Sequence, residues 1–266
     1  MSQLFIKPVM LAMQKPQPPT KLLPPAERGF TLPELLISLV LGITLIGAIL
    51  SAYLTTLQSS GDNNAQVELS HNLRASLDLI LSDLKRAGGV ERPLTLSTVL
   101  SQYADNPFMD NVSNLKLWQC NALHECHCVT YSYDRERDGN PYAGYNNHFG
   151  FKLDSRKRIS SRRGPLAPSS GPHPGCDYHA SNNQWEALTE DSIKITQFSV
   201  SYIDQDGDVI PQPKAISAPS GGTCSTGDHC IEARHLLVTI SGTKDAFSLT
   251  ITGKVRVRND RYFKRL

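Results

Sequence analysis

Residues 28–53 read RGFTLPELLISLVLGITLIGAILSAY, and this stretch decides the architecture of the chain. Its apolar part, from Leu35 to Tyr53, contains no charged residue. A helix needs about 20 predominantly apolar residues to cross a bilayer core of about 30 Å. The stretch therefore predicts one membrane-spanning helix near the start of the sequence.

The preceding residues, 1–29, indicate how that helix is oriented. They contain six prolines, which are incompatible with a stable helix. Their basic residues outnumber their acidic one, with Lys7, Lys15, Lys21 and Arg28 against Glu27. Because cytoplasmic flanks carry the excess of Lys and Arg, we expect this leader in the cytoplasm and everything after Tyr53 in the periplasm. An ordinary cleaved secretory signal fits less well, since its apolar core spans only about 7–15 residues.

All six cysteines fall in the part of the chain that is expected outside the cytoplasm. An even number of cysteines in an oxidising compartment favours disulfides. The disulfide candidates are Cys120, Cys126, Cys128, Cys176, Cys224 and Cys230. Cys224–Cys230 would close a short loop and is the favoured pair, while Cys126 and Cys128 are too close to be favoured as partners. The connectivity otherwise stays open.

Zinc is the alternative to disulfides around the first three cysteines. His124 and His127 lie among them, but the spacing fits no standard pair-plus-pair pattern of zinc ligands. We therefore predict no metal and no cofactor.

The junction between the leader and the apolar run carries a family resemblance. Arg28-Gly29-Phe30-Thr31-Leu32-Pro33-Glu34-Leu35-Leu36 resembles the type III signal of type IV prepilins. The resemblance implies that prepilin peptidase cuts between Gly29 and Phe30 and methylates the new amine of Phe30. It also implies that Glu34 pairs with the N-terminal amine of a neighbouring subunit during filament growth. Pro33 departs from the aliphatic residue common there, but a helix tolerates proline in its first turn.

A second helical pattern follows the apolar run. Between residues 58 and 89, apolar residues recur at spacings of three and four, which predicts an amphipathic helix. They are Leu69, Leu73, Leu77, Ile80, Leu84 and Ala87. Gly88-Gly89 is a plausible stop, and the polar patch 59–64 predicts a bend or local melt between the two helical halves.

The stretch from Asn72 to Gly89 narrows the resemblance. NLRASLDLILSDLKRAGG looks like the signature of minor pilins of the PilW kind, and the later Trp185-Glu186-Ala187-Leu188-Thr189 is similar to that family too. J-type pseudopilins of type II secretion share the front half and remain an alternative.

Beyond residue 115 the apolar periodicity changes from helical to alternating, which predicts strands. The alternating positions are Val129, Tyr131 and Tyr133; Phe149, Phe151 and Leu153; Ile193, Ile195, Phe198, Val200 and Tyr202; and segments 237–240, 249–251 and 255–258. We expect an α+β, pilin-like fold, in which the amphipathic helix covers an antiparallel meander. Long loops at 156–184 and 211–230 are expected to be either exposed and tied down by cysteines or a contact surface for other pilins or a ligand.

Three other patterns suggest chemistry but have simpler explanations. Asp204-Gln-Asp206-Gly207-Asp208 resembles part of a calcium loop, yet it lacks the later bidentate acid and fits an Asp-Gly hairpin turn. Residues 134–140 are likewise expected to form a charged turn. Basic groups at 156–158, 162–163 and 254–264 could attract DNA, but a solvated face is preferred, and the net charge of +2 implies no polyanionic partner.

These inferences combine into one prediction. The domains are a cleaved leader (1–29), a transmembrane and filament-core helix (30–57), an amphipathic helix (58–89) and a β-rich head (90–266). The resemblance implies a non-enzymatic minor pilin that primes type IV pilus assembly or sits at the tip, moving from the inner membrane to a surface pilus. Its implied partners are prepilin peptidase, other minor and major pilins, the inner-membrane assembly platform and membrane lipid. A single-pass anchored enzyme or binding domain is the contrasting hypothesis, while the choice among twitching, adhesion, DNA uptake and secretion stays open.

Overall fold

A computed structural model describes residues 29–90, 106–110, 113–137, 139–141, 147–164, 175–176, 185–218 and 220–266. The predicted leader lies outside these residues, apart from Gly29, as do Asp138 and much of the first long loop. The chain divides into two compact units, Met1–Thr56 and Leu57–Leu266, and each is described by itself.

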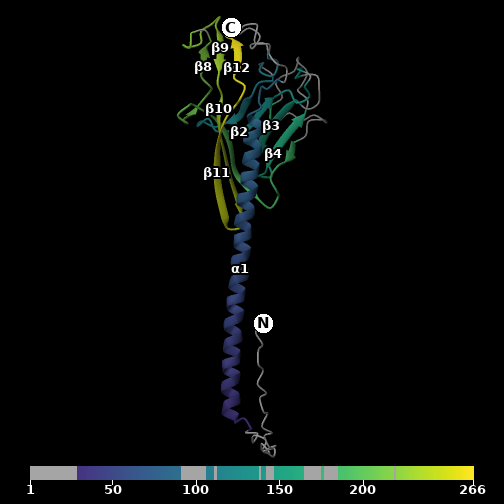
Figure 1. The fold of residues 1–266 in the computed structure, drawn as a ribbon, viewed down its shortest axis with the longest axis vertical. Coiled ribbons are helices and arrows are strands. Elements are labelled where there is room, and N and C mark those ends of the chain that lie inside the picture. The colour runs from purple at the N-terminus through teal and green to yellow at the C-terminus, as the bar shows by residue number, and fades with distance from the viewer. Residues whose placement is uncertain are drawn as a thin grey trace, which may run out of the picture. The chain divides into compact units, whose positions relative to one another are not determined.

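Helix α1 runs without a break from Leu32 to Leu84 (Figure 1). The local melt expected as one alternative at residues 59–64 is therefore wrong. A glycine in a helix costs only about 1 kcal/mol relative to alanine, so Gly61 and its polar neighbours do not stop a helix that continues on both sides. The helix ends before the predicted stop, and the chain turns at Gly88, where φ is +72°.

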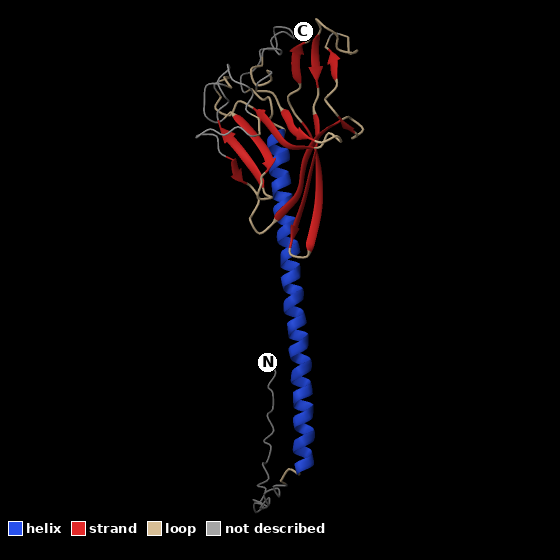
Figure 2. Ribbon diagram, turned by 180° about the vertical axis from the view of Figure 1, so that it is seen from behind, coloured by secondary structure: helices blue, strands red, loops and turns tan. Residues whose placement is uncertain are grey.

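In the second unit, nine strands form the main sheet (Figure 2). Its path runs β11-β10-β6-β2-β3-β4-β5, while β1 pairs with β2 and β7 pairs with β6. The strands are β1 (Lys116–Cys120), β2 (Cys126–Ser132), β3 (His148–Leu153), β4 (Ile159–Gly164), β5 (Trp185–Ala187), β6 (Lys194–Ile203), β7 (Val209–Ile210), β10 (His235–Lys244) and β11 (Phe247–Arg256). All pairings are antiparallel.

The predicted meander is correct only in part. Strands β2 to β5 are consecutive, but β6 crosses back and lies between β2 and β10. This strand carries Ile195, Phe198 and Val200, all fully buried. At the outer edge beside β5 these side chains would lose one flanking strand, so the central position buries more apolar surface.

A second, three-stranded sheet was not anticipated. It consists of β8 (Ala215–Ser217), β9 (His229–Glu232) and β12 (Arg261–Lys264), in the order β12-β9-β8. Strand β8 and the first half of β9 fall within the segment 211–230 that was expected to be loop. Strands this short leave too few alternating positions for the pattern to be recognised.

The core confirms the expected packing of helix on sheet. All six residues of the predicted apolar stripe of α1 and the turn that follows it are buried: Leu69, Leu73, Leu77, Ile80, Leu84 and Ala87. They pack against apolar side chains of the main sheet in one cluster. Glycines in the sheet allow α1 to approach it closely. A Cβ at Gly253 of β11 would lie only 2.5 Å from Leu81 Cδ1 of the helix. The α+β, pilin-like architecture is therefore present.

Candidate functional site

The predicted cleavage point lies just before α1. Phe30 is 80% exposed. A Cβ built on Gly29 would meet nothing within 4 Å. A peptidase would therefore meet little steric obstruction from the described residues around this bond.

Glu34 is held by the start of its own helix. The backbone N–H and the hydroxyl of Thr31 each donate a hydrogen bond of 2.9 Å to Oε2 of Glu34. The carbonyl of Thr31 accepts from Leu35 N–H at 3.2 Å, which begins the helical ladder. Thr31 and Glu34 thus have the spacing of a capping box and form one of its two bonds, from the Thr31 N–H to the Glu34 carboxylate. The carboxylate also sits in the first turn, where the helix dipole favours negative charge.

Thr31 had no predicted role. The Thr-x-x-Glu spacing before an apolar run was the signal for it. Pro33 lies inside the same first turn, as expected, and removes no internal hydrogen bond there.

In the first unit, α1 presents apolar side chains that nothing covers in the described residues. Every Leu, Ile, Val and Tyr from Leu32 to Leu54 is at least half exposed. The apolar part of α1 is long and apolar enough to span a membrane, and none of it is buried. Such a surface is costly in water, at about 25 cal/mol per Å². The helix therefore suits membrane anchoring, and it precedes a soluble head.

In the second unit, polar contacts hold α1 to the sheet at two levels. Glu68 forms an ion pair with Lys244 and accepts a hydrogen bond from Ser192 Oγ at 3.1 Å. The bond from Lys244, followed by the one from Ser192, lowers the pKa of the Glu68 carboxyl. Further along the helix, Asp83 accepts hydrogen bonds from the hydroxyls of Tyr131 and Tyr133, the second at 3.2 Å.

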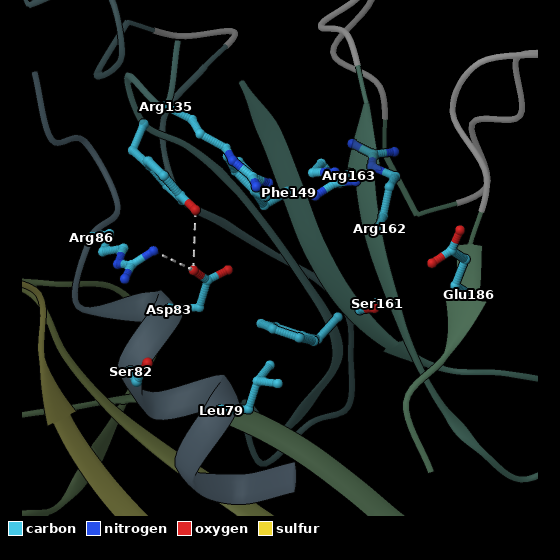
Figure 3. Close-up of a pocket in the computed structure, with 12 residues that line it drawn as sticks. Leu79, Ser82, Asp83, Arg86, Arg135, Phe149, Ser161, Arg162, Arg163 and Glu186 are labelled. Carbon is cyan, nitrogen blue, oxygen red and sulfur yellow. Dashed lines mark hydrogen bonds and ion pairs between the residues drawn. The ribbon is translucent and has the colours of Figure 1, made fainter. Parts of the chain in front are cut away.

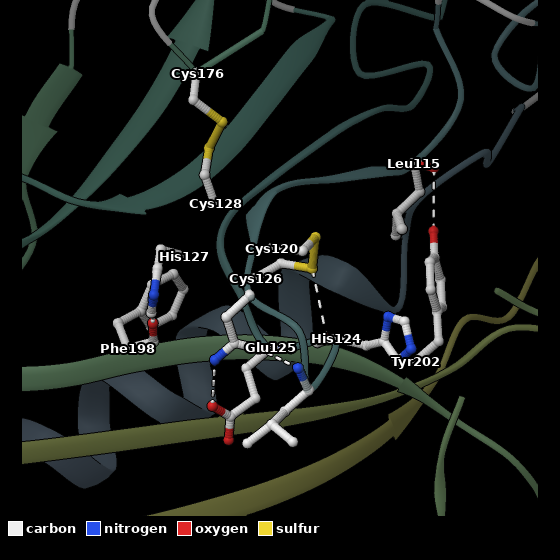
Figure 4. The surroundings of a disulfide bond; sticks show 12 residues. Leu115, Cys120, His124, Glu125, Cys126, His127, Cys128, Cys176, Phe198 and Tyr202 are labelled. Carbon is white, nitrogen blue, oxygen red and sulfur yellow. Dashed lines mark hydrogen bonds between the residues drawn. A yellow bond between two sulfur atoms is a disulfide. The ribbon is translucent and has the colours of Figure 1, made fainter. Parts of the chain in front are cut away.

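The structure joins all six cysteines in three disulfides (Figure 4). The pairs are Cys120–Cys126, Cys128–Cys176 and Cys224–Cys230. The third is the pair favoured from the sequence, and neighbouring Cys126 and Cys128 reach different partners. Cys120–Cys126 links strands β1 and β2 across their hairpin, where the two residues are register partners.

The three cysteines that would supply thiolates to a zinc ion are bonded in these disulfides. Nδ1 of His127 lies 2.8 Å from the carbonyl oxygen of Phe198. Figure 4 shows His124 on the other side of the hairpin, near Tyr202. Among the residues that the structure describes, no three His, Cys, Asp or Glu side chains gather as metal ligands.

The acidic segment 204–208 is a hairpin turn, as predicted. Oδ1 of Asp204 accepts the backbone N–H groups of Gly207 and Asp208, both at 2.8 Å. The turn connects β6 to β7, with Ile203 opposite Val209. These backbone bonds, above all that from Asp208, lower the pKa of Asp204. The carboxylate is therefore engaged in turn formation.

The basic groups do not form a uniformly solvated face. Arg162 is buried, with its guanidinium 5.3 Å from the centre of the Trp185 ring. Arg158 pairs with Asp154 at 3.2 Å and with Asp191 at 2.7 Å. The burial of Arg162 depends on the neighbouring strand that carries Trp185, and Asp191 is distant in sequence from Arg158, so neither contact could be predicted from local sequence.

A group of charged and aromatic side chains that was not predicted from the sequence lines a hollow in the head. It combines four arginines from three places in the chain with aromatic rings of β3 and two acids (Figure 3). No linear motif joins residues this far apart, so the sequence carried no signal for the hollow.

Comparison with known proteins supports the pilin-like interpretation. The family model for prepilin peptidase-dependent protein B matches residues 62–261. Searches of curated proteins and of solved structures gave no significant match. The matched residues begin after the junction motif, so the family match and the prepilin-like junction are independent observations on different parts of the chain.

The match points to a pilin-like protein that depends on prepilin peptidase, and it does not single out the PilW kind. Because it covers most of the sequence, the chain belongs to the family of prepilin peptidase-dependent protein B.

Proposed function

We propose that this protein is a minor pilin, which prepilin peptidase cleaves between Gly29 and Phe30 and methylates on Phe30. The observation that carries the proposal is the uncovered apolar surface of α1, placed directly after a prepilin-type junction. Lipid would cover that surface before assembly, and the helices of neighbouring subunits would cover it in a filament. The predicted boundaries at 29, 57 and 89 mark the leader, the filament-core helix and the helix that packs on the head.

Glu34 would direct the incorporation of the subunit into the filament. In the described chain its carboxylate is engaged only by Thr31 of the same helix end. A carboxylate in an apolar environment is stabilised by a positive partner. The free amine of Phe30 on a neighbouring subunit, created by cleavage, would supply one.

The protein would work with other minor pilins to prime pilus assembly or form the tip, on the inner-membrane platform and in contact with major pilins. The PilW-like signature at residues 72–89 favours this role. J-type pseudopilins share the front half, so a type II secretion filament is the second candidate. The family and the fold are typically non-enzymatic, and we propose no catalytic activity.

The level at which a Glu34 variant is incorporated into filaments tests the role of this residue. Glu34→Ala should insert into the membrane normally but appear in sheared filaments at a much lower level than the unaltered protein. Asp62→Ala is the matched control, because Asp62 is an exposed acid on the same helix, outside the apolar segment. Equal incorporation of the two variants would contradict the role proposed for Glu34.

A further inference from the structure

The hollow in the head has a volume of about 660 Å³ and is lined by the end of α1, the segment after β2, and strands β3, β4 and β5. Its charged side chains come from segments far apart in the sequence (Figure 3). They are Arg86, Arg135, Arg162 and Arg163, with Asp83 and Glu186. Cationic groups therefore exceed acidic ones around it.

Some of these charged groups are already engaged within the head. Asp83 accepts hydrogen bonds from Tyr131 and Tyr133, and it lies 3.8 Å from Arg86. Arg162 is buried and donates to the carbonyl of Gly175 at 3.4 Å. Arg86 is exposed but already pairs with Asp83, and Arg162 is buried in the wall of the hollow.

Arg135 and Arg163 differ from them. Both residues are exposed, and no acidic side chain of the described chain lies within ion-pair distance of either. Strand register places Arg163 opposite Phe149. Arg135, Phe149 and Arg163 all line the hollow, and we call the part at the two exposed arginines its rim (Figure 3). Two guanidinium groups are thus available to one ligand.

Apolar side chains also line the hollow. Leu79 is 45% exposed although it lies on the part of α1 that packs in the head. The rings of Phe149 and Phe151 also line the hollow. A ligand that fills the site would therefore bring a negative group and an apolar group close together.

We propose that the hollow binds an acidic peptide segment of another polypeptide, with an Asp or Glu side chain at Arg135 and Arg163 and a neighbouring apolar side chain against Leu79. The planar guanidinium fork matches a carboxylate in bidentate geometry. Clusters of arginines are a recurring means of recognising acidic motifs. This inference concerns the head alone and does not depend on the proposed pilin function.

Nucleic acid fits the hollow less well. Duplex DNA carries one negative charge per about 1.7 Å of its axis. A phosphate backbone that crossed the hollow would approach the carboxylates of Asp83 and Glu186 as well as the arginines. A peptide can place one carboxylate at the rim and keep the rest of its contact neutral.

A binding assay with the full-length protein in detergent micelles tests the proposal. The probe is a fluorescent peptide of alternating glutamate and leucine, and the comparison peptide has glutamine in place of glutamate. We expect the glutamate peptide to bind, and its affinity to fall with rising salt because the rim is exposed. Arg163→Ala should weaken binding about tenfold or more, as expected for a lost charge-assisted hydrogen bond.

The matched control is Arg156→Ala, since Arg156 is an exposed arginine on the turn between β3 and β4 and does not line the hollow. It should leave the affinity unchanged, whereas Arg163→Lys should retain part of it by keeping the charge without the fork. Arg135→Ala gives an independent test if Arg163→Ala lowers the unfolding midpoint. The proposal is overturned if the glutamine peptide binds equally well, if the rim variants bind like Arg156→Ala, or if a DNA duplex displaces the peptide and binds more tightly.

Discussion

Replacing Leu73 with alanine should destabilise the head strongly. Leu73 lies at the centre of the apolar stripe of α1 and is fully buried. It packs against strand β10, where a Cβ at Gly242 would lie only 3.2 Å from Cδ2 of Leu73. Because glycine has no side chain that could move into the space left by leucine, the cavity should persist.

The expected loss follows from that cavity. Buried Leu→Ala substitutions cost about 2–5 kcal/mol, with the larger values where the site cannot collapse. We therefore expect a loss of about 3–5 kcal/mol in the free energy of unfolding of the head. With a typical urea m-value of about 1–3 kcal/mol per M, the midpoint should fall by at least about 1 M.

Urea unfolding of the full-length protein in detergent micelles measures this loss. The fluorescence of Trp118 and Trp185 reports on the head, since both residues lie in strands of the main sheet. Val67→Ala is the matched control, because Val67 lies on the same helix but is 67% exposed, and it should change stability by no more than about 0.5 kcal/mol. Equal midpoints for the two variants would refute the packing of α1 on β10.

Two further predictions concern pH and disulfides. Because Lys244 and Ser192 lower the pKa of Glu68 below its ordinary 4.5, its stabilising contribution is present above that value and is lost as the pH falls toward the lowered pKa. Glu68→Gln should therefore make the unfolding midpoint less sensitive to pH in the acid range, as a pH series of unfolding curves would show. Removing the Cys128–Cys176 disulfide, which spans 48 residues, should cost about 4 kcal/mol in the chain-entropy model, as measured by urea unfolding of the double serine variant.

Each of these predictions has its own control. Asp62→Asn changes an exposed acid of α1 and should leave the dependence of the unfolding midpoint on acid pH intact. If Asp62→Asn and Glu68→Gln gave the same pH profile, the stabilising ion pair between Glu68 and Lys244 of β10 would be contradicted. Removing Cys224–Cys230, which spans only six residues, should cost less, about 2 kcal/mol. A larger loss of stability on removing Cys224–Cys230 than on removing Cys128–Cys176 would contradict the chain-entropy model.

The sequence predicted those features that depend on local periodicity. The apolar stripe from Leu69 to Ala87 is buried at every predicted position, because spacings of three and four define one helix face whatever lies opposite. Alternation likewise located β2, β3, β6, β10 and β11, whereas β4 lies within the segment 156–184 that was expected to be a loop. The local melt considered at residues 59–64 was wrong, because polar residues lower helix propensity without preventing a helix.

Features that depend on pairing between distant segments were not predictable in this way. Strand β6 lies between β2 and β10, and its own residues do not indicate which strands it pairs with. The burial of Arg162 depends on Trp185 of the adjacent strand. The rim formed by Arg135 and Arg163 arises only once β2, β3 and β4 have paired.

The most direct test of the proposed function is the N-terminal sequence and intact mass of the protein taken from native membranes. We predict a chain that begins at N-methylated Phe30 and continues through Glu34, with residues 1–29 removed. Cells that lack prepilin peptidase should yield the uncleaved form. A chain that retains residues 1–29 in cells with active prepilin peptidase would contradict the proposal and leave a single-pass anchored head in its place.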